Sequence, residues 1–205
     1  MKLYYFETPN TRKPCAVAKY LGSPVEFVLL DPAKQEHKTP AFLAINPNGK
    51  VPALEDGETK FWESSAIMCY LAHKAGSDLW PKDERQIDII RWFSWDTAHF
   101  SRHAGVLFFQ HVVKRWIGAG NADPAVVEEA TEFFKQFASV LNAYLKGRQY
   151  LVGDTLTLAD FAVGAFLPYA DEARLPIDGF PEIQRWHARL NEIDAWREPF
   201  PETAP

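Results

Sequence analysis

The residue types suited to chemistry gather at two places in the first third of the chain, each where a strand-like run meets a helix-like run. At the first place, Thr8-Pro9-Asn10 follows the apolar run Leu3 to Phe6 and offers a hydroxyl and an amide. At the second, Glu63-Ser64 offers a carboxylate and a hydroxyl. Backbone N–H groups at a helix start attract anions, so both places favour an anionic ligand group. The alternative is that Thr8 and Ser64 only cap their helices.

A basic loop and a proline lie between these two places. His37, Lys38 and Lys50 are basic side chains that can bind a carboxylate through charge-assisted hydrogen bonds. They could equally belong to a solvated loop. Val51 before Pro52 suits the presentation of main-chain donors and acceptors to an extended peptide, and the alternative is an ordinary trans proline at the start of a strand.

The elements that must position these residues follow the order β-α-β-α-β-β-α. Apolar spacing predicts a helix over Thr11 to Leu21, with Pro14 in its first turn. The runs Val51 to Leu54 and Thr59 to Trp62 flank a turn and predict a hairpin. A helix over Ser64 to Ala75 closes this part of the chain.

Beyond a linker at Leu79 to Asp83, the patterns are helical throughout. A Thr157 cap with Asp160 three residues later predicts a capping box and a helix start. The other expected helices run from Glu84 to about Val113, from Asp123-Pro124 to near Gly147, and from about Pro181 to Leu190. The sequence therefore predicts an α/β part followed by an all-helical part.

Composition narrows the classes of function. The chain has 205 residues, a net charge of −5 and 22 basic residues that are scattered along it, which argues against nucleic acid or a membrane surface as the partner. The charged residues near the amino terminus do not fit a signal peptide, and no run is apolar enough for a membrane helix. Cys15 and Cys69 form no disulfide framework. We expect a cytoplasmic protein.

Four stretches in order resemble the glutathione transferase family, in a bacterial-type form closest to its phi, theta and nu-like classes. They are Glu36-His37-Lys38, Asn46 to Gly57, Trp62 to Ile67, and Asp154 to Phe161 with its capping box. The resemblance covers nearly the whole chain. It implies a thioredoxin-like α/β domain over residues 1–77 that binds glutathione, and an all-helical domain over residues 84–205 that contributes the electrophile site.

The resemblance also implies roles for single residues, with glutathione as co-substrate and no metal. It implies a cis Val51-Pro52 bond, which turns the main chain of Val51 toward the ligand. Thr8 matches the catalytic serine position of the phi and theta classes, and Thr8 with Asn10 matches the nu-like pair. The glutathione-binding residues are then His37, Lys38, Lys50, Val51, Pro52, Glu63 and Ser64.

A hydroxyl at this position could keep the glutathione sulfur ionised without a general base. Lowering a thiol pKa by two units requires about 2.7 kcal/mol. One charge-assisted hydrogen bond contributes about 1.5–3 kcal/mol and a helix terminus about 0.3–1 kcal/mol. The stiff χ1 of threonine leaves the aim of Thr8 at the sulfur open, as does the choice between Thr8 and Asn10.

Other candidate residues have competing interpretations. Cys15 lies within the first helix, so a buried apolar thiol is favoured over a redox centre. His99 and His103 share a helix face but lack a third metal ligand. The family's electrophile site falls near Ser101, Arg102, Gly105, Phe108 and Phe109, which could equally form plain aromatic core.

The function expected from the resemblance is conjugation of glutathione to a small hydrophobic electrophile, as in detoxification, by a homodimer. One alternative is reduction of glutathione disulfides or peroxides, because of the nu-like Thr8 and Asn10. The other is a glutathione-binding scaffold without catalysis, since folds and functions separate readily.

Overall fold

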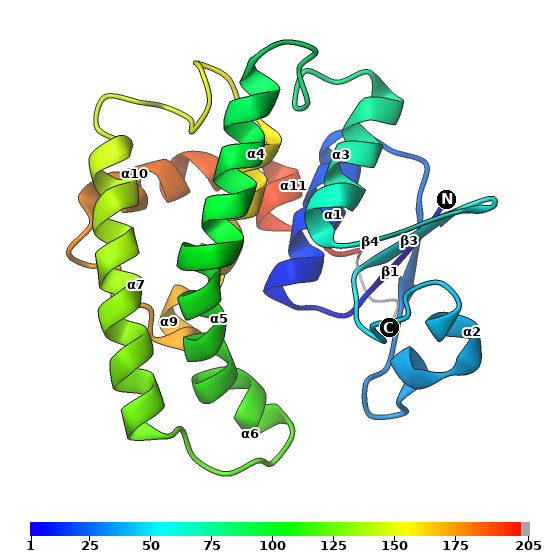
Figure 1. Ribbon diagram of the computed structural model, residues 1–205, viewed down its shortest axis with the longest axis horizontal. Coiled ribbons are helices and arrows are strands. Elements are labelled where there is room, and N and C mark those ends of the chain that lie inside the picture. The colour runs from blue at the N-terminus through cyan, green and yellow to red at the C-terminus, as the bar shows by residue number, and fades with distance from the viewer. Residues whose placement is uncertain (202–205) are drawn as a thin grey trace. The chain divides into compact units, whose positions relative to one another are not determined.

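The computed structural model describes residues 1–201, which divide into two compact units (Figure 1). The first unit holds Met1–Pro81 together with the described residues from Ile193 onward, and the second holds Lys82–Glu192. The break after Pro81 lies within the expected linker. The segment after Glu192 differs from expectation, because it joins the first unit rather than the helical one.

A four-stranded sheet forms the centre of the first unit. Its strands are β1 (Lys2–Tyr5), β2 (Glu26–Leu29), β3 (Ala53–Asp56) and β4 (Thr59–Trp62), in the spatial order β2-β1-β3-β4. β1 runs parallel to β2 and antiparallel to β3, and β3 runs antiparallel to β4. Leu3 pairs with Leu54, and both are fully buried. The expected thioredoxin-like order of elements is confirmed.

The helices of this unit follow the expected pattern with one correction. They are α1 (Pro9–Tyr20), the 3-10 turn η1 (Glu36–Lys38), α2 (Pro40–Leu43) and α3 (Ser64–Ala75). The start of α1 was expected at Thr11, but Thr8 caps the helix and Pro9 is its first residue. Pro14 therefore lies in the helix interior, not in the first turn. The prediction was wrong because the capping by Thr8 was not used to set the boundary.

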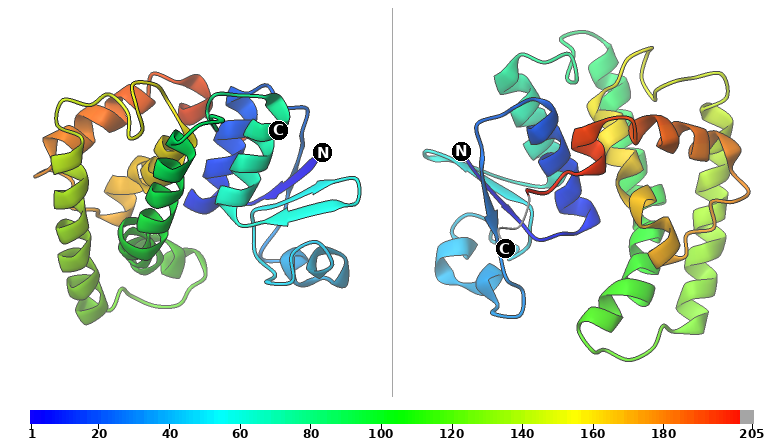
Figure 2. Two further views of the ribbon diagram at one scale, coloured as in Figure 1. Left: turned by 45° about the horizontal axis from the view of Figure 1, so that its top comes forward. Right: turned by 180° about the vertical axis from the view of Figure 1, so that it is seen from behind.

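The C-terminal segment packs on α1. Its helix α11 (Asp194–Arg197) places Trp196, which is fully buried, against Arg12. The Arg12 guanidinium donates to the Trp196 carbonyl and lies 5.0 Å from the centre of its indole ring. Lys19 Nζ donates to the Phe200 carbonyl at 3.0 Å. Figure 2 shows this red segment beside the blue α1.

Helices make up the regular structure described in the second unit, and none in the described chain is long and apolar enough to cross a membrane. One nearly continuous helical run replaces the long helix expected from Glu84, and two π turns interrupt it. The elements are α4 (Arg85–Trp95), π turn η2 (Asp96–Phe100), α5 (Ser101–Phe108), π turn η3 (Phe109–Val113), α6 (Lys114–Trp116), α7 (Pro124–Tyr144), α8 (Leu158–Val163), 3-10 turn η4 (Gly164–Tyr169), α9 (Ala170–Ala173) and α10 (Pro181–Leu190).

The predicted capping box forms the buried centre of the second unit. Asp160 is fully buried and accepts hydrogen bonds from the Thr157 N–H at 2.9 Å, the Leu151 N–H at 3.0 Å and Trp186 Nε1 at 3.0 Å. Elsewhere in the core of this unit, Phe100 and Phe134 stack with ring centres 4.9 Å apart. The box therefore ties the start of α8 to α10 as well as capping its own helix.

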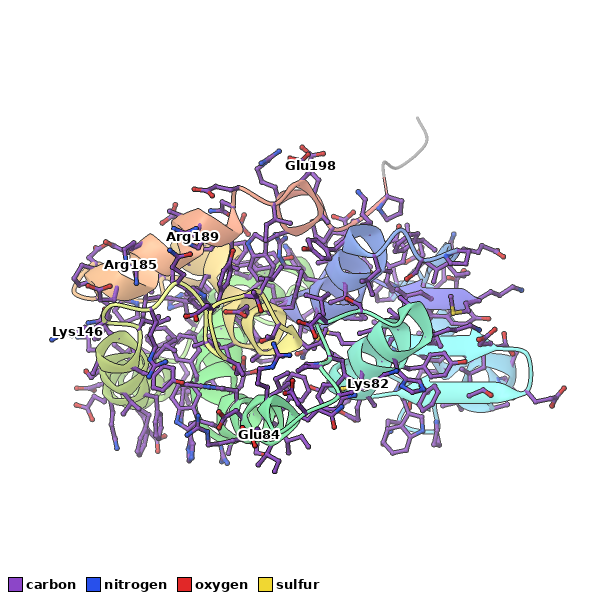
Figure 3. All side chains as sticks on the ribbon, turned by 90° about the horizontal axis from the view of Figure 1, so that it is seen from above. Lys82, Glu84, Lys146, Arg185, Arg189 and Glu198 are labelled. Carbon is purple, nitrogen blue, oxygen red and sulfur yellow. The ribbon has the colours of Figure 1, made fainter. Side chains whose placement is uncertain are left out.

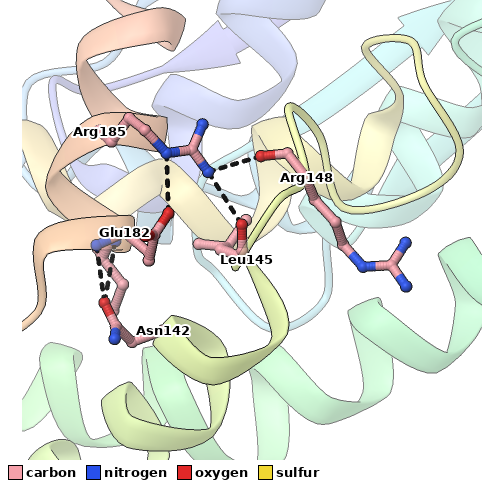
Figure 4. A network of polar contacts seen from close by, with 6 residues as sticks. Asn142, Leu145, Arg148, Glu182 and Arg185 are labelled. Carbon is pink, nitrogen blue, oxygen red and sulfur yellow. Dashed lines mark hydrogen bonds and ion pairs between the residues drawn. The ribbon is translucent and has the colours of Figure 1, made fainter.

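A polar network joins the end of α7 to α10 (Figure 4). Asn142 Oδ1 accepts the Glu182 N–H at 2.9 Å, and so satisfies a donor at the start of α10. Arg185 donates to the carbonyls of Leu145 at 2.9 Å and Arg148 at 2.6 Å, and pairs with Glu182 at 2.8 Å. Charged side chains such as Lys82, Glu84, Lys146 and Arg185 are exposed in this unit (Figure 3).

Candidate functional site

The sheet topology brings the predicted glutathione-binding segments to one end of the first unit. In the sheet register Tyr4 pairs with Ala53, and Ala53 pairs with Trp62. Because β3 is antiparallel to β1 and β4, the chain that leaves β1, the chain that enters β3 and the chain that leaves β4 meet at one end of the sheet. β2 is parallel to β1, so the chain toward η1 leaves there as well.

Thr8 and Asn10 lie where the chain leaves β1. Thr8 has extended backbone angles, and its half-buried side chain forms a capping box with Thr11. Asn10 is exposed, and its amide has no hydrogen-bond partner among the described residues. The two candidates thus differ, because the Thr8 hydroxyl is held in place and the Asn10 side chain is free to turn.

Thr11 is a residue that the sequence analysis missed. Its side chain is fully buried, and its Oγ1 accepts the Thr8 N–H at 3.2 Å and lies 3.1 Å from Thr8 Oγ1. The same hydroxyl is within donating distance of the carbonyls of Phe6 and Thr8. The spacing of two threonines three residues apart at a helix start is the signal that could have indicated it.

Val51 offers its main chain as the resemblance implied. The Val51-Pro52 peptide bond is cis. The sheet ladder begins only at Ala53, and the N–H and C=O of Val51 have no hydrogen-bond partner among the described residues. An extended peptide could therefore pair with both groups.

Asn46 holds the loop before Val51, a role that the sequence analysis did not assign beyond a turn. It is buried, and its Nδ2 donates to the Lys50 carbonyl at 2.5 Å. Its Oδ1 accepts from the backbone and the side chain of Asn48, each at 3.0 Å. Asn46 thus sets the direction in which Lys50 and Val51 leave the loop.

The basic side chains approach this loop from two sides. Lys38 Nζ donates to the Gly49 carbonyl at 3.3 Å. Gly49 has φ +59, which favours glycine, and a Cβ on it would also lie 3.1 Å from the His37 carbonyl and 2.9 Å from Lys38 Nζ. His37 and Lys50 have no hydrogen bond or ion pair among the described residues, which leaves them available to a carboxylate.

Glu63 and Ser64 lie where the chain leaves β4. Glu63 has φ 72 and ψ 121, a conformation that costs a non-glycine residue about 1–3 kcal/mol and is concentrated at functional sites. Its carboxylate is exposed and without a partner in the described chain. The Ile67 N–H bonds to the Glu63 carbonyl, so the three N–H groups of residues 64–66 are not used by α3. They can bind a carboxylate.

Of the predicted electrophile residues in the second unit, some pack against neighbouring side chains and others are exposed. Ser101 Oγ donates to Asp96 Oδ1 at 2.6 Å, and Phe108 is buried with its ring 5.6 Å from that of Trp116. A Cβ on Gly105 would contact Phe166 at 3.5 Å. Arg102 and Phe109 are exposed.

A separate groove of about 650 Å³ lies in the second unit, and it includes none of the predicted electrophile residues. It is mainly polar, with cations and carboxylates on its walls. The residues that line it are Gln110, His111, Arg115, Gly120, Asn121, Ala122, Asp171, Glu172 and Arg174. Burial lowers the pKa of His111, and the arginines lower it further.

The remaining candidates for chemistry are packed. Cys15 is fully buried, as expected, and burial raises the pKa of its thiol. His99 and His103 stack on Phe137, with ring centres 4.4 and 5.7 Å apart. The part of the chain that the structure describes holds no group of three or more His, Cys, Asp or Glu side chains able to bind a metal ion.

Comparison with known proteins gives close sequence relatives. The N-terminal domain of glutathione S-transferases matches residues 1–73, and the C-terminal domain of that family matches residues 103–194. Glutathione S-transferase 3 of Zea mays is 37% identical over 194 residues, which cover 91% of this chain and 86% of the maize protein. This relative comes from a plant, so it gives no support to the expected bacterial type.

Solved structures extend the likeness to the fold. Glutathione S-transferase I bound with lactoylglutathione has a TM-score of 0.87 and 29% identity, and the match covers 97% of each chain. A glutathione transferase family member from Pseudomonas fluorescens with two glutathione bound has a TM-score of 0.85 and 28% identity, over 97% of this chain and 91% of that one. This chain therefore belongs to the glutathione S-transferase family.

Proposed function

We propose that the first unit binds glutathione across the loops at the carboxyl end of β1 and keeps its sulfur ionised beside Thr8. As a family member, the chain is a glutathione transferase with glutathione as its co-substrate. The observation that best supports the proposed position is the unpaired main chain of Val51, at the same end of the sheet as Thr8 and Glu63. A peptide paired with Val51 could place one end at Glu63 and Ser64 and the other end at the basic side chains of His37, Lys38 and Lys50.

Each part of glutathione finds a matching group. The γ-glutamyl carboxylate binds the free N–H groups at the start of α3 and the Ser64 hydroxyl, while Glu63 accepts from the ammonium group. The cysteinyl residue pairs with the Val51 main chain. The glycyl carboxylate binds the cations His37, Lys38 and Lys50.

The thiolate is stabilised by a hydroxyl at a helix start. Thr8 Oγ1 donates to the sulfur, and the positive end of α1 favours its negative charge. No side chain has to act as a general base, since the thiol loses its proton to solvent when its pKa falls below the ambient pH. The thiolate sulfur then bonds to carbon of a small apolar electrophile, and a leaving group departs with its bonding electrons, halide in the case of an aryl halide. Arg102 and Phe109, both exposed, remain predictions for contact with the electrophile.

Two assays test the proposal. Calorimetry with glutathione should give a saturable heat that is lost in the double variant Lys50→Ala and Ser64→Ala, and an aryl halide should be conjugated only when glutathione is present. Thr157→Val, which removes a buried hydroxyl from the second unit, is the matched control and should keep the heat of binding. An unchanged heat in the double variant would refute the proposed position.

Disulfide reduction is the second candidate. A similar structure holds two glutathione molecules, the number that is oxidised to glutathione disulfide when one disulfide is reduced to two thiols, and this chain has the nu-like pair Thr8 and Asn10. Turnover of disulfides far above that of aryl halides, measured on one preparation, would favour this activity. The homodimer and the cytoplasmic location also remain predictions, and sedimentation velocity tests the first.

A further inference from the structure

The hydroxyl groups of Thr8 and Thr11, at the start of α1, form a hydrogen bond with each other. Its direction determines whether Thr8 can donate to the glutathione sulfur. Thr11 Oγ1 accepts the Thr8 N–H at 3.2 Å and lies 3.1 Å from Thr8 Oγ1, where either hydroxyl can donate. Thr11 is fully buried and Thr8 is half-buried. A ligand can therefore reach Thr8 but not the Thr11 side chain.

The single proton of the Thr11 hydroxyl has three acceptors to choose from. They are the carbonyls of Phe6 and Thr8, the latter at 2.9 Å, and Thr8 Oγ1. The Thr8 carbonyl also accepts the Arg12 N–H at 2.9 Å, so it keeps a partner when Thr11 turns its proton away. Donation to Thr8 Oγ1 competes with donation to the nearby Phe6 carbonyl, but it leaves the Thr8 carbonyl with a partner.

The direction of the bond between the two hydroxyls decides what Thr8 can do. If Thr8 donates to Thr11, its only hydroxyl proton points into the protein and cannot reach a sulfur. If Thr11 donates to Thr8, the Thr8 proton is free for a ligand. In that arrangement Thr8 Oγ1 accepts from the Thr11 hydroxyl and, through the capping box, from the Thr11 N–H, which fills both of its lone pairs.

We propose that Thr11 is a positioning residue for Thr8, donating its hydroxyl proton to Thr8 Oγ1 so that Thr8 donates to the glutathione sulfur. The inference rests on the proposed function. Two hydrogen bonds in a chain polarise one another, so donation from Thr11 makes Thr8 a stronger donor. The contact also holds the Thr8 side chain in one rotamer, which answers how a threonine can be aimed at the sulfur.

The experiment titrates the thiol of bound glutathione through its ultraviolet thiolate absorbance, in the full chain and in the variants Thr11→Val, Thr11→Ser and Thr8→Val. Valine has the shape of threonine without the hydroxyl, and serine restores it. We expect Thr11→Val to raise the pKa of the bound thiol by about 0.5–1 unit, or three- to tenfold less thiolate below the pKa. Thr11→Ser should restore the pKa, and the Kd for glutathione should change less than about threefold, since glutathione does not touch Thr11.

The outcomes separate this inference from the proposed function. A shift in Thr8→Val without one in Thr11→Val overturns the inference and leaves the function standing, and no shift in either removes Thr8 from the thiolate site. A shift in Thr11→Val alone, or a loss of stability in it without a shift, also overturns the inference. Thr157→Val should leave the thiol pKa unchanged. If Thr11→Val does not fold, Thr11→Cys, with its weak S–H donor, is titrated instead and should give a shift of the same sign.

Discussion

At the scale of single residues, the fold treats the two catalytic candidates differently. The Thr8 hydroxyl is held in a cap at the positive end of α1, whereas the Asn10 side chain is exposed and unpaired in the described chain. A preorganised donor stabilises a developing or resting charge without first losing rotamer freedom. Thr8 is therefore the stronger candidate for the sulfur contact.

Substitution of these two residues should give unequal losses. We expect Thr8→Val to lower kcat/KM for an aryl halide by about 10- to 100-fold, the effect of losing one hydrogen bond to a charged group, with little change in the Kd for glutathione. Asn10→Ala should cost only a few-fold. Steady-state kinetics with calorimetry on both variants measures this, and a larger loss in Asn10→Ala would assign the sulfur contact to Asn10.

The two cysteines should be unreactive in the native protein. Cys15 is fully buried, and burial raises its pKa well above the ordinary value. Burial also raises the pKa of Cys69 to about 12. Since the thiolate is the reactive form, an aromatic disulfide reagent should label neither thiol within minutes at neutral pH and both in denaturant. Rapid native labelling of Cys15 would revive the redox-centre interpretation.

At the scale of elements, helix starts do the positioning. α1 and α3 begin at the same end of the sheet. The N–H groups of residues 64–66 are unused at α3, whereas at α1 Pro9 has no N–H and the capping box occupies the N–H of Thr11; α8 begins with a capping box of the same kind. In α8 the acidic partner is Asp160, whose burial raises its pKa to about 6 although the donors of Thr157, Leu151 and Trp186 oppose the shift.

The raised pKa of Asp160 makes stability depend on pH. In the unfolded chain its pKa is near the ordinary value of 3.8, so between about pH 4 and 6 only the folded state holds the proton. The contribution of Asp160 to the free energy of unfolding is therefore greatest below its pKa in the unfolded chain, and it is lost as the pH rises through its pKa of about 6 in the folded protein. Going from pH 7 to 5 should add about 1 kcal/mol to the free energy of unfolding.

Urea unfolding of Asp160→Asn checks this contribution. The variant should be less stable by about 1–3 kcal/mol, because the amide nitrogen cannot accept from a buried donor. Its change in stability from pH 7 to 5 should be smaller than that of the wild type by about 1 kcal/mol, since the titrating group is gone. An equal pH dependence in both proteins would contradict the assignment to Asp160.

At the scale of the whole molecule, the chain begins and ends in the same unit. The described residues from Ile193 onward belong with Met1–Pro81, and fully buried Trp196 packs against Arg12 on the helix that begins at Thr8. The last helix therefore supports the first unit, although Lys82–Glu192 forms a separate one.

Loss of the contact between Trp196 and Arg12 should destabilise the first unit. We expect Trp196→Ala to lower the free energy of unfolding by about 3–5 kcal/mol, the usual cost of truncating a buried aromatic side chain, and to weaken glutathione binding at temperatures where wild type still binds. Chemical denaturation and calorimetry test this. Ile87→Ala, at a position 71% exposed, is the control and should stay within about 0.5 kcal/mol of wild type.

Local signals in the sequence were enough for most elements. Ser64–Ala75 was predicted to the residue and the helix from about Pro181 to Leu190 has the expected extent, because caps, prolines and apolar spacing act within a few residues of the boundary. The residues proposed to bind glutathione came from a motif whose order and spacing can be read in the linear chain. A helix start missed by two residues, at Pro9, shows where local signals conflict.

Only the tertiary structure could decide which segments meet. The sheet register places Thr8, Val51 and Glu63 at one end, and no local pattern specifies a pairing between strands some fifty residues apart. The contact of Trp196 with Arg12 could not be predicted from local pattern either. In the sequence Thr11 is an ordinary helix residue, and only its burial shows that its hydroxyl is limited to a few partners. The residue types alone determined which chemical groups are available, whereas the partners of each group depended on packing between distant parts of the chain.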